Sequence, residues 1–443
     1  MPDGKVFPSC AEEEEEDTKD EGETSQENVE TIYEEDENPS FTKLRPSRKK
    51  ALLELRSRVE DAIHNNYILG KKKGKRGKVK RKGKSSRENG KERENLKDIT
   101  LWGVPLLPSK GHEGTNVVLM KFLKTKDFKV SEAFKMLQRT LKWRRDFNAE
   151  GILDENLCSH LENLICINGT DKQGHPVCYI TCGALKDKEL YMKTFGSREN
   201  FKDCLRWRIQ FMEKGIQELS FNPGGVDAIV QITDLKNSPG PAMKELHLSN
   251  RKTMMLLQEY YPELIFKNIV INVPFWNFMC HALHWQFITQ RNKSKFIFAR
   301  PSRVTETLVK YIAPENIPVQ YGGLKREDDD EFSSDDTVSE LIVKVGAKGA
   351  IKIPMSEIGV TVVWDVIAIG HGVSYKEEFV PDDDCSYNLL LQMEKKMGRS
   401  VRNSFYINEP GKIVITIENQ SYKKKKVFYR YKTKLTLPVY IFK

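Results

Sequence analysis

The chain has 443 residues, enough for two or three domains, and 30% of them are charged. Its longest uncharged stretch, NIVINVPFWNFMCHALHWQFITQ, contains seven Asn, His and Gln residues and a proline, which argues against a membrane-spanning helix. The net charge of +9 conceals two blocks of opposite sign, an acidic one over residues 1–40 and a basic one over 71–93.

Residues 1–95 are predicted to be mostly disordered. The acidic block holds 16 acidic and 2 basic side chains and the basic block 13 basic and 2 acidic, and such blocks bury no core. One short helix is expected over 47–69, with Ser47 as its cap. Its apolar face contains Leu52, Leu55, Val59 and Ile63.

Three interpretations of the basic block remain open: a solvated linker, a contact for anionic lipid, or a nuclear or nucleic-acid patch. No aromatic residue lies between its basic residues, so stacking on single strands is not supported and no nucleic-acid partner is expected. The opening residues MPDGKVFPSC lack the apolar region of a signal peptide, and the eight cysteines have no zinc-binding spacing. Five of them lie among apolar residues, as buried reduced cysteines do: Cys158, Cys166, Cys178, Cys182 and Cys204. We therefore expect a cytoplasmic protein.

Residues 96–148 are predicted to form a small helical subdomain. The prolines of LWGVPLLPSK favour an extended lead-in, and NVVLMKFLKTKDF and KVSEAFKMLQRTLKWRRDF both have helical periodicity. In the second helix one apolar face is formed by Val130, Phe134, Leu137 and Leu141.

Residues 149–325 alternate between strands and helices. The strands are expected in PVCYITCGA, VDAIVQITDLK, IVINV and KFIFA, with helices in NFKDCLRWRIQFMEKGIQEL and PAMKELHLSNRKTMMLLQEYYP. This alternation predicts an α/β domain with parallel strand pairing.

The helix predicted over 275–288 is apolar almost all round and must be covered by something. It is either a central core helix or the wall of a pocket for an apolar ligand. After it, KREDDDEFSSDDT provides an acidic linker over 326–337. Residues 338–443 then change to a period of two, with β-rich segments in AIKIPM, GVTVVWDVIAI, KIVITIE and VFYRYKT, which predicts an all-β sandwich.

No catalytic motif stands out. The chain contains no G-x-G-x-x-G, P-loop or G-x-S-x-G. His281 and His284 have a spacing that permits metal ligation, but no acidic residue lies nearby in the sequence, and Asp234 is interpreted as a helix or loop cap. We therefore expect neither an enzyme nor a metal site, and no cofactor.

Several short stretches resemble one known family. WRRDF, ITDLK, YYPE, SKFIF and ENIPVQYGG, in this order, resemble the CRAL-TRIO lipid-transfer domain with its N-terminal helical subdomain. The lead-in LWGVPLL, the acidic tail and the C-terminal WDV, FVP, NEPGKIVITIEN and KKKKVFYRYKTK resemble the patellins, which makes the last domain a GOLD domain. The resemblance covers roughly residues 96–443.

The resemblance implies a lipid chamber closed by a gate helix. The gate and pocket residues would be Phe275, Phe278, Met279, Ala282, Leu283 and Phe287. The headgroup of a phosphatidylinositol would be held by Lys126, Glu263, Asn292 and Lys295. The alternative interpretations are solvated surface charge for the two lysines and a structural ion-pair partner for Glu263. Ile229 and Gln231 stand where choline-lipid binders place hydroxyls, so a choline lipid is not expected. A basic turn contacting membrane is expected at Lys423, Lys424, Lys425 and Lys426.

The family thus implies a peripheral membrane protein that binds phosphoinositides and transfers lipid in vesicle trafficking. The expected membranes are the plasma membrane or the cell plate of dividing cells, and the expected partners are phosphoinositides and anionic membrane surfaces. The rival function is a trafficking adaptor that recruits proteins through the GOLD domain, with a structural or sensory lipid pocket.

Overall fold

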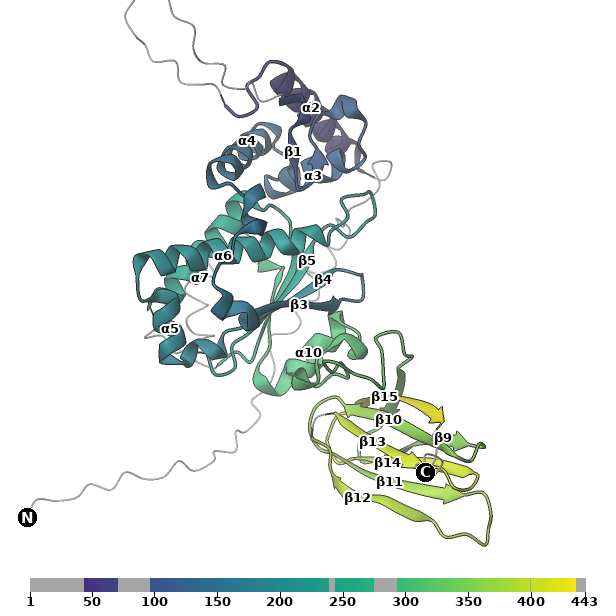
Figure 1. Ribbon diagram of the computed structural model, residues 1–443. Helices are drawn as coiled ribbons and strands as arrows, with labels where there is room; N and C mark the ends of the chain where they lie inside the picture. Colours follow the sequence, from purple (N-terminus) through teal and green to yellow (C-terminus); the bar gives the residue numbers. More distant parts are fainter. Residues whose placement is uncertain (1–43, 71–95, 239–243, 275–292, 399, 436–443) are drawn as a thin grey trace, which may run out of the picture.

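The computed structural model describes residues 44–70, 96–238, 244–274, 293–398 and 400–435 (Figure 1). The predicted gate helix and Asn292 lie outside these ranges. Short 3-10 helices occur at Leu96–Asp98, Pro108–Lys110, Glu150–Asp154, Ser159–Leu164, Gly183–Lys186, Pro301–Arg303, Pro314–Asn316 and Val319–Tyr321.

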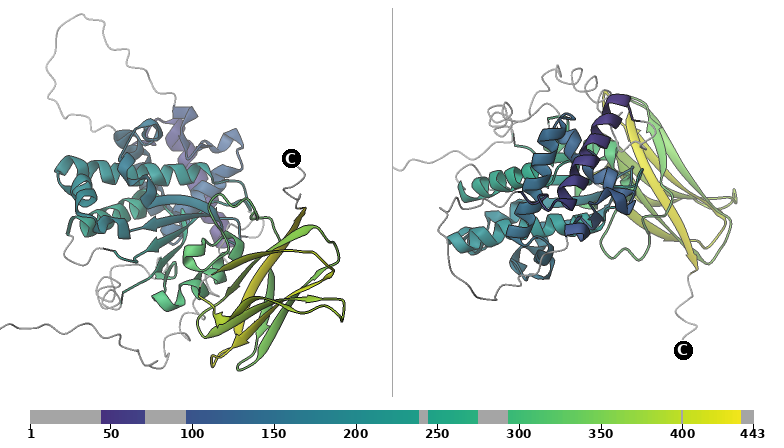
Figure 2. Two further views of the ribbon diagram at one scale, coloured as in Figure 1. Left: turned by 60° about the horizontal axis from the view of Figure 1, so that its bottom comes forward. Right: turned by 90° about the horizontal axis from the view of Figure 1, so that it is seen from above.

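The N-terminal part contains three helices and a two-stranded ribbon. The helices are α2 (Pro46–His64), α3 (Gly114–Thr125) and α4 (Val130–Phe147), and the strands are β1 (Thr100–Leu101) and β2 (Val104–Pro105). Helix α2 packs on α3 and α4 (Figure 2) and buries the four predicted apolar residues. Ser47 is not its cap, because Arg45 holds that place and Pro46, which lacks an N–H, begins the helix.

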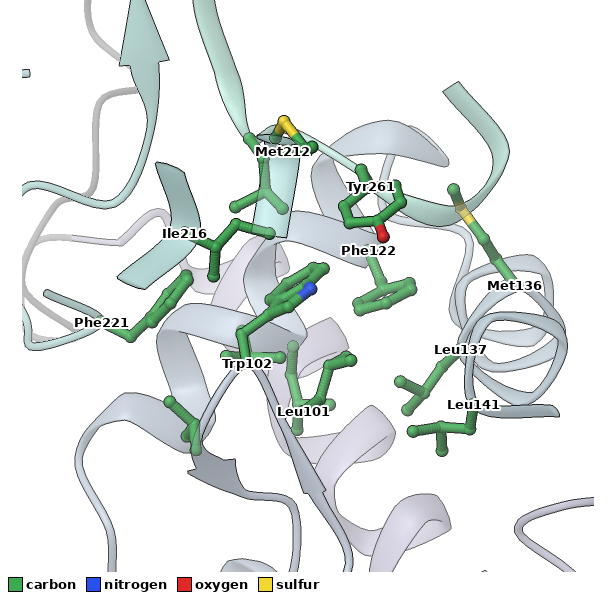
Figure 3. Close-up of a cluster of buried hydrophobic side chains, with 14 of the residues drawn as sticks. Leu101, Trp102, Phe122, Met136, Leu137, Leu141, Met212, Ile216, Phe221 and Tyr261 are labelled. Atoms are coloured by element: carbon green, nitrogen blue, oxygen red, sulfur yellow. The ribbon is translucent and has the colours of Figure 1, made fainter. Parts of the chain in front are cut away.

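A single apolar core joins these helices to the α/β domain. Trp102 lies at its centre, stacked on Phe122 of α3 and on Phe221, which lies in the loop before the strand Ile229–Asp234 (Figure 3). Met212 and Ile216, on a helix of the α/β domain, complete the cluster. The extended lead-in therefore packs between the helical subdomain and the α/β domain and holds the two together.

The α/β domain has a five-stranded sheet in the order β3-β4-β5-β6-β7. The strands are β3 (Ile165–Thr170), β4 (Pro176–Thr181), β5 (Ile229–Asp234), β6 (Ile265–Ile271) and β7 (Phe296–Phe298). The four predicted strands pair in parallel, as expected, and β3 adds an antiparallel edge. Cys166 lies on this edge and is exposed, so the expectation that it is a buried thiol is wrong.

Helices cover the two faces of this sheet differently. Helices α5 (Lys188–Phe195), α6 (Arg198–Gln217) and α7 (Lys244–Tyr260) lie on one side and α10 (Val304–Tyr311) on the other (Figure 1). Side chains cap the starts of α5 and α6, where Asp187 and Ser197 accept backbone N–H groups at 2.8 and 3.0 Å. The face toward α10 is closed and apolar, with Val177, Tyr179, Val230, Ile232, Ile269 and Ile271 buried.

The C-terminal part is a sandwich of two four-stranded antiparallel sheets, in the orders β13-β10-β15-β8 and β12-β11-β14-β9. Four strands fall in predicted segments: β9 (Lys348–Met355), β10 (Val360–Ala368), β14 (Gly411–Asn419) and β15 (Lys425–Leu435). Four more were not predicted individually: β8 (Ser339–Val343), β11 (Val373–Pro381), β12 (Leu389–Lys396) and β13 (Val401–Tyr406).

The segment predicted as an acidic linker is bound to the outer face of the sandwich. Arg430 and Arg402 stand opposite Asp365 on the strands that flank β10. From the linker, Arg326 donates to Asp365 at 2.8 Å, and Asp329 accepts two hydrogen bonds from Arg402 at 2.6 and 2.7 Å. The linker is therefore part of the folded structure and not a loose tether.

Helix α10 forms the bridge between the two domains. Val309 on this helix packs against a small cluster that includes Ile367 and Ile369 of the sandwich. The left view of Figure 2 shows the sandwich against the side of the α/β domain that carries α10. The linker and this apolar contact together hold the sandwich beside the sheet layer.

Candidate functional site

An ion pair stands where β6 and β7 begin. The Lys295 ammonium lies 2.7 Å from Glu263 Oε2 and donates a second hydrogen bond to the Ile265 carbonyl at 3.1 Å. The side chains of Lys295 and Glu263 keep 21% and 11% of their surface exposed. The pair is thus largely withdrawn from water but open on one side, so a ligand can reach both charges.

The backbone around Glu263 is held in an unusual conformation. Its φ is 54°, in the left-handed region that residues other than glycine rarely adopt. The carbonyl of Glu263 accepts a hydrogen bond from the Lys121 ammonium at 2.9 Å, and Thr125 Oγ1 lies 3.4 Å from its carboxylate. Helix α3 therefore holds the backbone of Glu263 through Lys121 and contacts its carboxylate through Thr125.

Lys121 is buried, with 3% of its surface exposed, and pairs with Asp227 at 3.2 Å. Burial lowers its pKa to about 8, although the neighbouring Asp227 opposes the shift. At neutral pH the amine is therefore mostly charged, and it brings a second positive charge close to the Glu263–Lys295 pair.

The structure brings together two of the four predicted headgroup residues, Glu263 and Lys295. Lys126 directly follows Thr125 at the end of α3, so its backbone is near the pair. Its half-buried side chain lines a separate groove. Lys121, Thr125 and Asp227 were not predicted from the sequence. A single lysine inside the apolar segment VVLMKFL, on the face of α3 that also carries Val117, could have pointed to Lys121.

The second face of the sheet is only partly covered, in contrast to the face that meets α10. Two rows of side chains cross it in register: Cys178, Gln231, Asn268 and Phe296, and then Ile180, Thr233, Val270 and Phe298. Gln231, Thr233, Asn268 and both phenylalanines are half-buried. This face offers an apolar floor with an amide pair at its centre, on the side of the sheet that α6 and α7 cover.

The four lysines predicted as one turn have different environments. Lys423 and Lys424 are exposed in the turn before β15, whereas Lys425 and Lys426 belong to the strand. Lys426 pairs with Glu340 at 2.9 Å, and burial lowers the pKa of Lys425, which lies near Glu306 of α10. The prediction of a four-lysine turn is therefore wrong at two positions, because the strand begins earlier than the charges suggest.

Other candidate groups have structural roles. Asp234 accepts from the Lys236 N–H at 2.8 Å and from the Asn272 amide at 2.7 Å, which confirms the loop cap. His281 and His284 lie outside the described ranges. Within those ranges, no cluster of His, Cys, Asp and Glu is suited to hold a metal ion. No described helix combines the length and apolarity needed to cross a bilayer.

Comparison with known proteins gives matches to both domains. Residues 162–323 match the CRAL/TRIO domain, and residues 344–425 match the family described as Patellin-1-like, C-terminal GOLD domain. Patellin-4 of Arabidopsis thaliana is 51% identical over 341 residues, which cover 76% of this chain and 62% of that protein. Patellin-3 of the same plant is 39% identical over 406 residues, covering 90% of this chain and 77% of that protein.

A more distant relative is the Phosphatidylinositol transfer protein SFH5 of Kluyveromyces lactis. It is 26% identical over 215 residues, which cover 46% of this chain and 67% of that protein. The chain spans only 62% of Patellin-4 and 51% of Patellin-5. With a CRAL-TRIO domain, a GOLD sandwich and this extended identity to Patellin-3, the chain belongs to the patellin family.

Proposed function

We propose that this chain binds a phosphatidylinositol-type lipid and transfers or presents it at membrane surfaces. The observation that carries the proposal is the largely buried but still accessible Glu263–Lys295 pair, which is supported by the buried Lys121. Lys295 would take the headgroup phosphate, and Glu263 would accept hydrogen bonds from inositol hydroxyls. Because the pair is already formed, the headgroup must exchange one partner for another, and this exchange would favour a ligand that has both a phosphate and hydroxyls.

The acyl chains would lie over the half-exposed face of the sheet. Phe296 and Phe298, whose rings stack at 6.2 Å, provide apolar surface there. The gate residues from 275–287, together with Asn292 and Lys126, remain the proposed cover and further headgroup contacts. Burial of each CH₂ group contributes about 0.8 kcal/mol, but the bilayer solvates the same chains, so the headgroup would set the selectivity.

The cellular role proposed here is in vesicle trafficking at the plasma membrane or the cell plate. It involves binding and exchange, without bond making, by a peripheral protein that recognises phosphoinositides and anionic surfaces. The name of the SFH5 relative as a phosphatidylinositol transfer protein supports the lipid class. The pairing of the lipid domain with a GOLD domain supports a place in membrane traffic.

Mass spectrometry of lipid that co-purifies with the full chain tests the proposal. Wild-type protein should carry phosphatidylinositol, and Lys295→Ala and Glu263→Gln should lose most of it. Lys202→Ala, which removes an exposed lysine on α6, is the matched control and should retain the lipid. Unchanged phosphatidylinositol in Lys295→Ala, or an isoprenoid as the dominant ligand, would contradict the proposed headgroup site.

One observation favours the adaptor function as a second candidate. Strand β12 is an edge of its sheet and exposes Leu389, Leu390 and Met393 by 46%, 52% and 70%. An extended segment of another protein can add to such an edge. If the adaptor function is correct, partner proteins should still bind the lipid-free Lys295→Ala variant and should be lost when Met393 and Leu390 are replaced by lysine.

A further inference from the structure

A basic groove runs along α4, beside the end of the α2 segment. Its volume is about 420 Å³. The lining residues are Leu69, Gly70, Lys126, Glu132, Lys135, Gln138, Arg139 and Lys142. Four of these side chains are positive and one is negative, so the groove attracts an anion.

The positive charges form a stripe because of helical spacing. Lys135, Arg139 and Lys142 follow one another at four and three residues on the exposed side of α4, opposite the buried Phe134 and Leu137. Like charges at these spacings repel each other. Arg139 has only an exposed pair with Glu259 at 3.6 Å.

Within the described part of the chain, Lys126, Lys135 and Lys142 have no ion-pair partner. Their repulsion would therefore be relieved by an occupant that carries several negative charges at once.

We propose that the acidic run EEEEED at residues 12–17 of the same chain docks in this groove. The run is the densest block of negative charge in the sequence, and the groove needs a short, flexible, multiply charged occupant. The contact would consist of exposed ion pairs, so it would be weak and salt-sensitive. It would act as a reversible cover over Lys126 and the α4 stripe.

The position of the run along the chain supports the contact. The start of α2 lies near the Lys126 end of the groove, because the Arg48 guanidinium stands 4.9 Å from the ring of Phe128, two residues after Lys126. Twenty-nine residues separate Asp17 from Pro46, which is more than enough chain to reach this end of the groove.

The second acidic run, Glu34–Glu37, is a built-in comparison. It has four consecutive acidic residues, whereas the run at 12–17 has six, so it can form fewer ion pairs with the groove at one time. We therefore expect the first run to occupy the groove and the second run to contribute little.

Docking would regulate access to the proposed lipid site. Lys126 belongs to both the groove and the end of α3, and Thr125 beside it contacts Glu263. A docked tail would keep anionic membranes away from this side of the domain. This consequence rests on the proposed function, whereas the contact itself does not.

Lysine acetylation read by mass spectrometry tests the contact without any lipid. In the full chain at low salt, Lys126, Lys135 and Lys142 should react about three to ten times more slowly than in a variant with Glu12 to Glu16 changed to Gln, as expected for a few weak pairs. Lys352 on β9 and Lys188 on α5 are exposed references that should not change. Changing Glu34, Glu35, Asp36 and Glu37 to amides should leave most of the protection.

Three results would overturn the proposal. Equal acetylation rates in the wild-type chain and the Glu12–Glu16 variant would show that the groove is not covered. Protection confined to the lysines of 71–84 would assign the tail to the basic block. Protection that disappears on dilution would assign the contact to a second copy.

Vesicles that contain phosphatidylserine then test the consequence. The Glu12–Glu16 variant should bind them several times more tightly than wild type, and Lys135→Ala with Lys142→Ala should cancel the gain. Groove protection in the acetylation assay without any vesicle effect would leave the contact standing and remove only its role at membranes.

Discussion

Asp365 on β10 and Arg430 on β15 stand directly opposite each other, and Arg430 donates two hydrogen bonds of 3.1 Å to this carboxylate. Asp365 is fully buried and also accepts from Arg402 and Arg326. Arg430 extends the contact by donating to the carbonyls of Leu324 and Ser333. One carboxylate on β10 thus connects both neighbouring strands, β13 and β15, with the segment that leads from the CRAL-TRIO domain.

Replacing Asp365 by Asn should release this segment. Three guanidinium groups would lose their shared anion, and removing one partner from a buried pair costs about 3–5 kcal/mol. Trypsin should then cut after Lys325 and Arg326 at least ten times faster than in wild type. Asp336→Asn is the control: it removes a partly exposed pair with Lys432 at 3.7 Å, and the amide oxygen of Asn can still accept the Ser333 N–H that the carboxylate accepts at 2.8 Å. Equal cleavage in both variants would show that the linker is not held by Asp365.

The sandwich also shows why some strands escape prediction from sequence. Strand β11, VSYKEEFVP, alternates buried and less buried positions, but one of its buried residues is Glu377. Trp364 Nε1 and Asn403 donate to this carboxylate at 2.9 and 2.7 Å, which offsets its desolvation. Both partners lie outside β11, so the sequence of this strand alone gave no sign that a glutamate could be buried there. In β14 the buried isoleucines Ile413, Ile415 and Ile417 alternate regularly with less buried residues, so this strand could be predicted.

In the candidate site, too, residues within short local motifs were predicted and residues with distant partners were not. Glu263 and Lys295 were predicted through the family resemblance, because YYPE and SKFIF are short motifs of consecutive residues that can be recognised in the sequence. Lys121 escaped because its partners, Asp227 and the Glu263 carbonyl, are more than 100 residues away along the chain. From the sequence alone, a lysine at this position only interrupts the apolar face of α3 and does not reveal its partners. The overall architecture was predictable from periodicity, and the tertiary partners of buried charges were not.

The adjacent arginines of WRRDF should differ sharply in their effect on stability. Arg144 is buried and holds Glu213 of α6 with hydrogen bonds of 2.6 and 3.2 Å, and Tyr261 donates to the same carboxylate. Arg144→Ala should lower the free energy of unfolding by about 3–5 kcal/mol, since it leaves Glu213 buried without its cation. Arg145 is exposed beside Asp146, and Arg145→Ala should cost no more than about 0.5 kcal/mol.

Urea denaturation followed by circular dichroism measures both variants. A similar loss of stability in the two would mean that the Arg144–Glu213 pair does not join the helical subdomain to α6.

The buried Lys121 predicts a rise in stability with pH. Its pKa falls from 10.5 in the unfolded chain to about 8 in the folded one, chiefly through burial, so the native state holds fewer protons between these values. The stability penalty is fully present below about pH 8 and is relieved as the pH approaches 10.5. A shift of this size corresponds to about 3 kcal/mol.

Unfolding free energies of wild type and Lys121→Met, measured from pH 7.5 to 10.5, isolate this residue. The unfolding free energy of wild type minus that of the variant should rise by up to about 3 kcal/mol from pH 7.5 to 10.5. A flat difference curve would show that Lys121 titrates normally.

The divided basic segment of the sandwich should separate membrane contact from folding. Lys423 and Lys424 are exposed, and each would contribute about 1 kcal/mol near an anionic surface. Replacing both by Ala should weaken binding to phosphoinositide vesicles about tenfold or more without changing the unfolding temperature, because about 1.4 kcal/mol corresponds to a factor of ten. Replacing Lys426 by Ala removes the pair with Glu340 that joins β15 to β8, so we expect a lower unfolding temperature and a smaller loss of binding. Vesicle co-sedimentation and calorimetry of the two variants compare these effects directly, and a larger binding loss in Lys426→Ala would place the membrane contact on the strand and not on the turn.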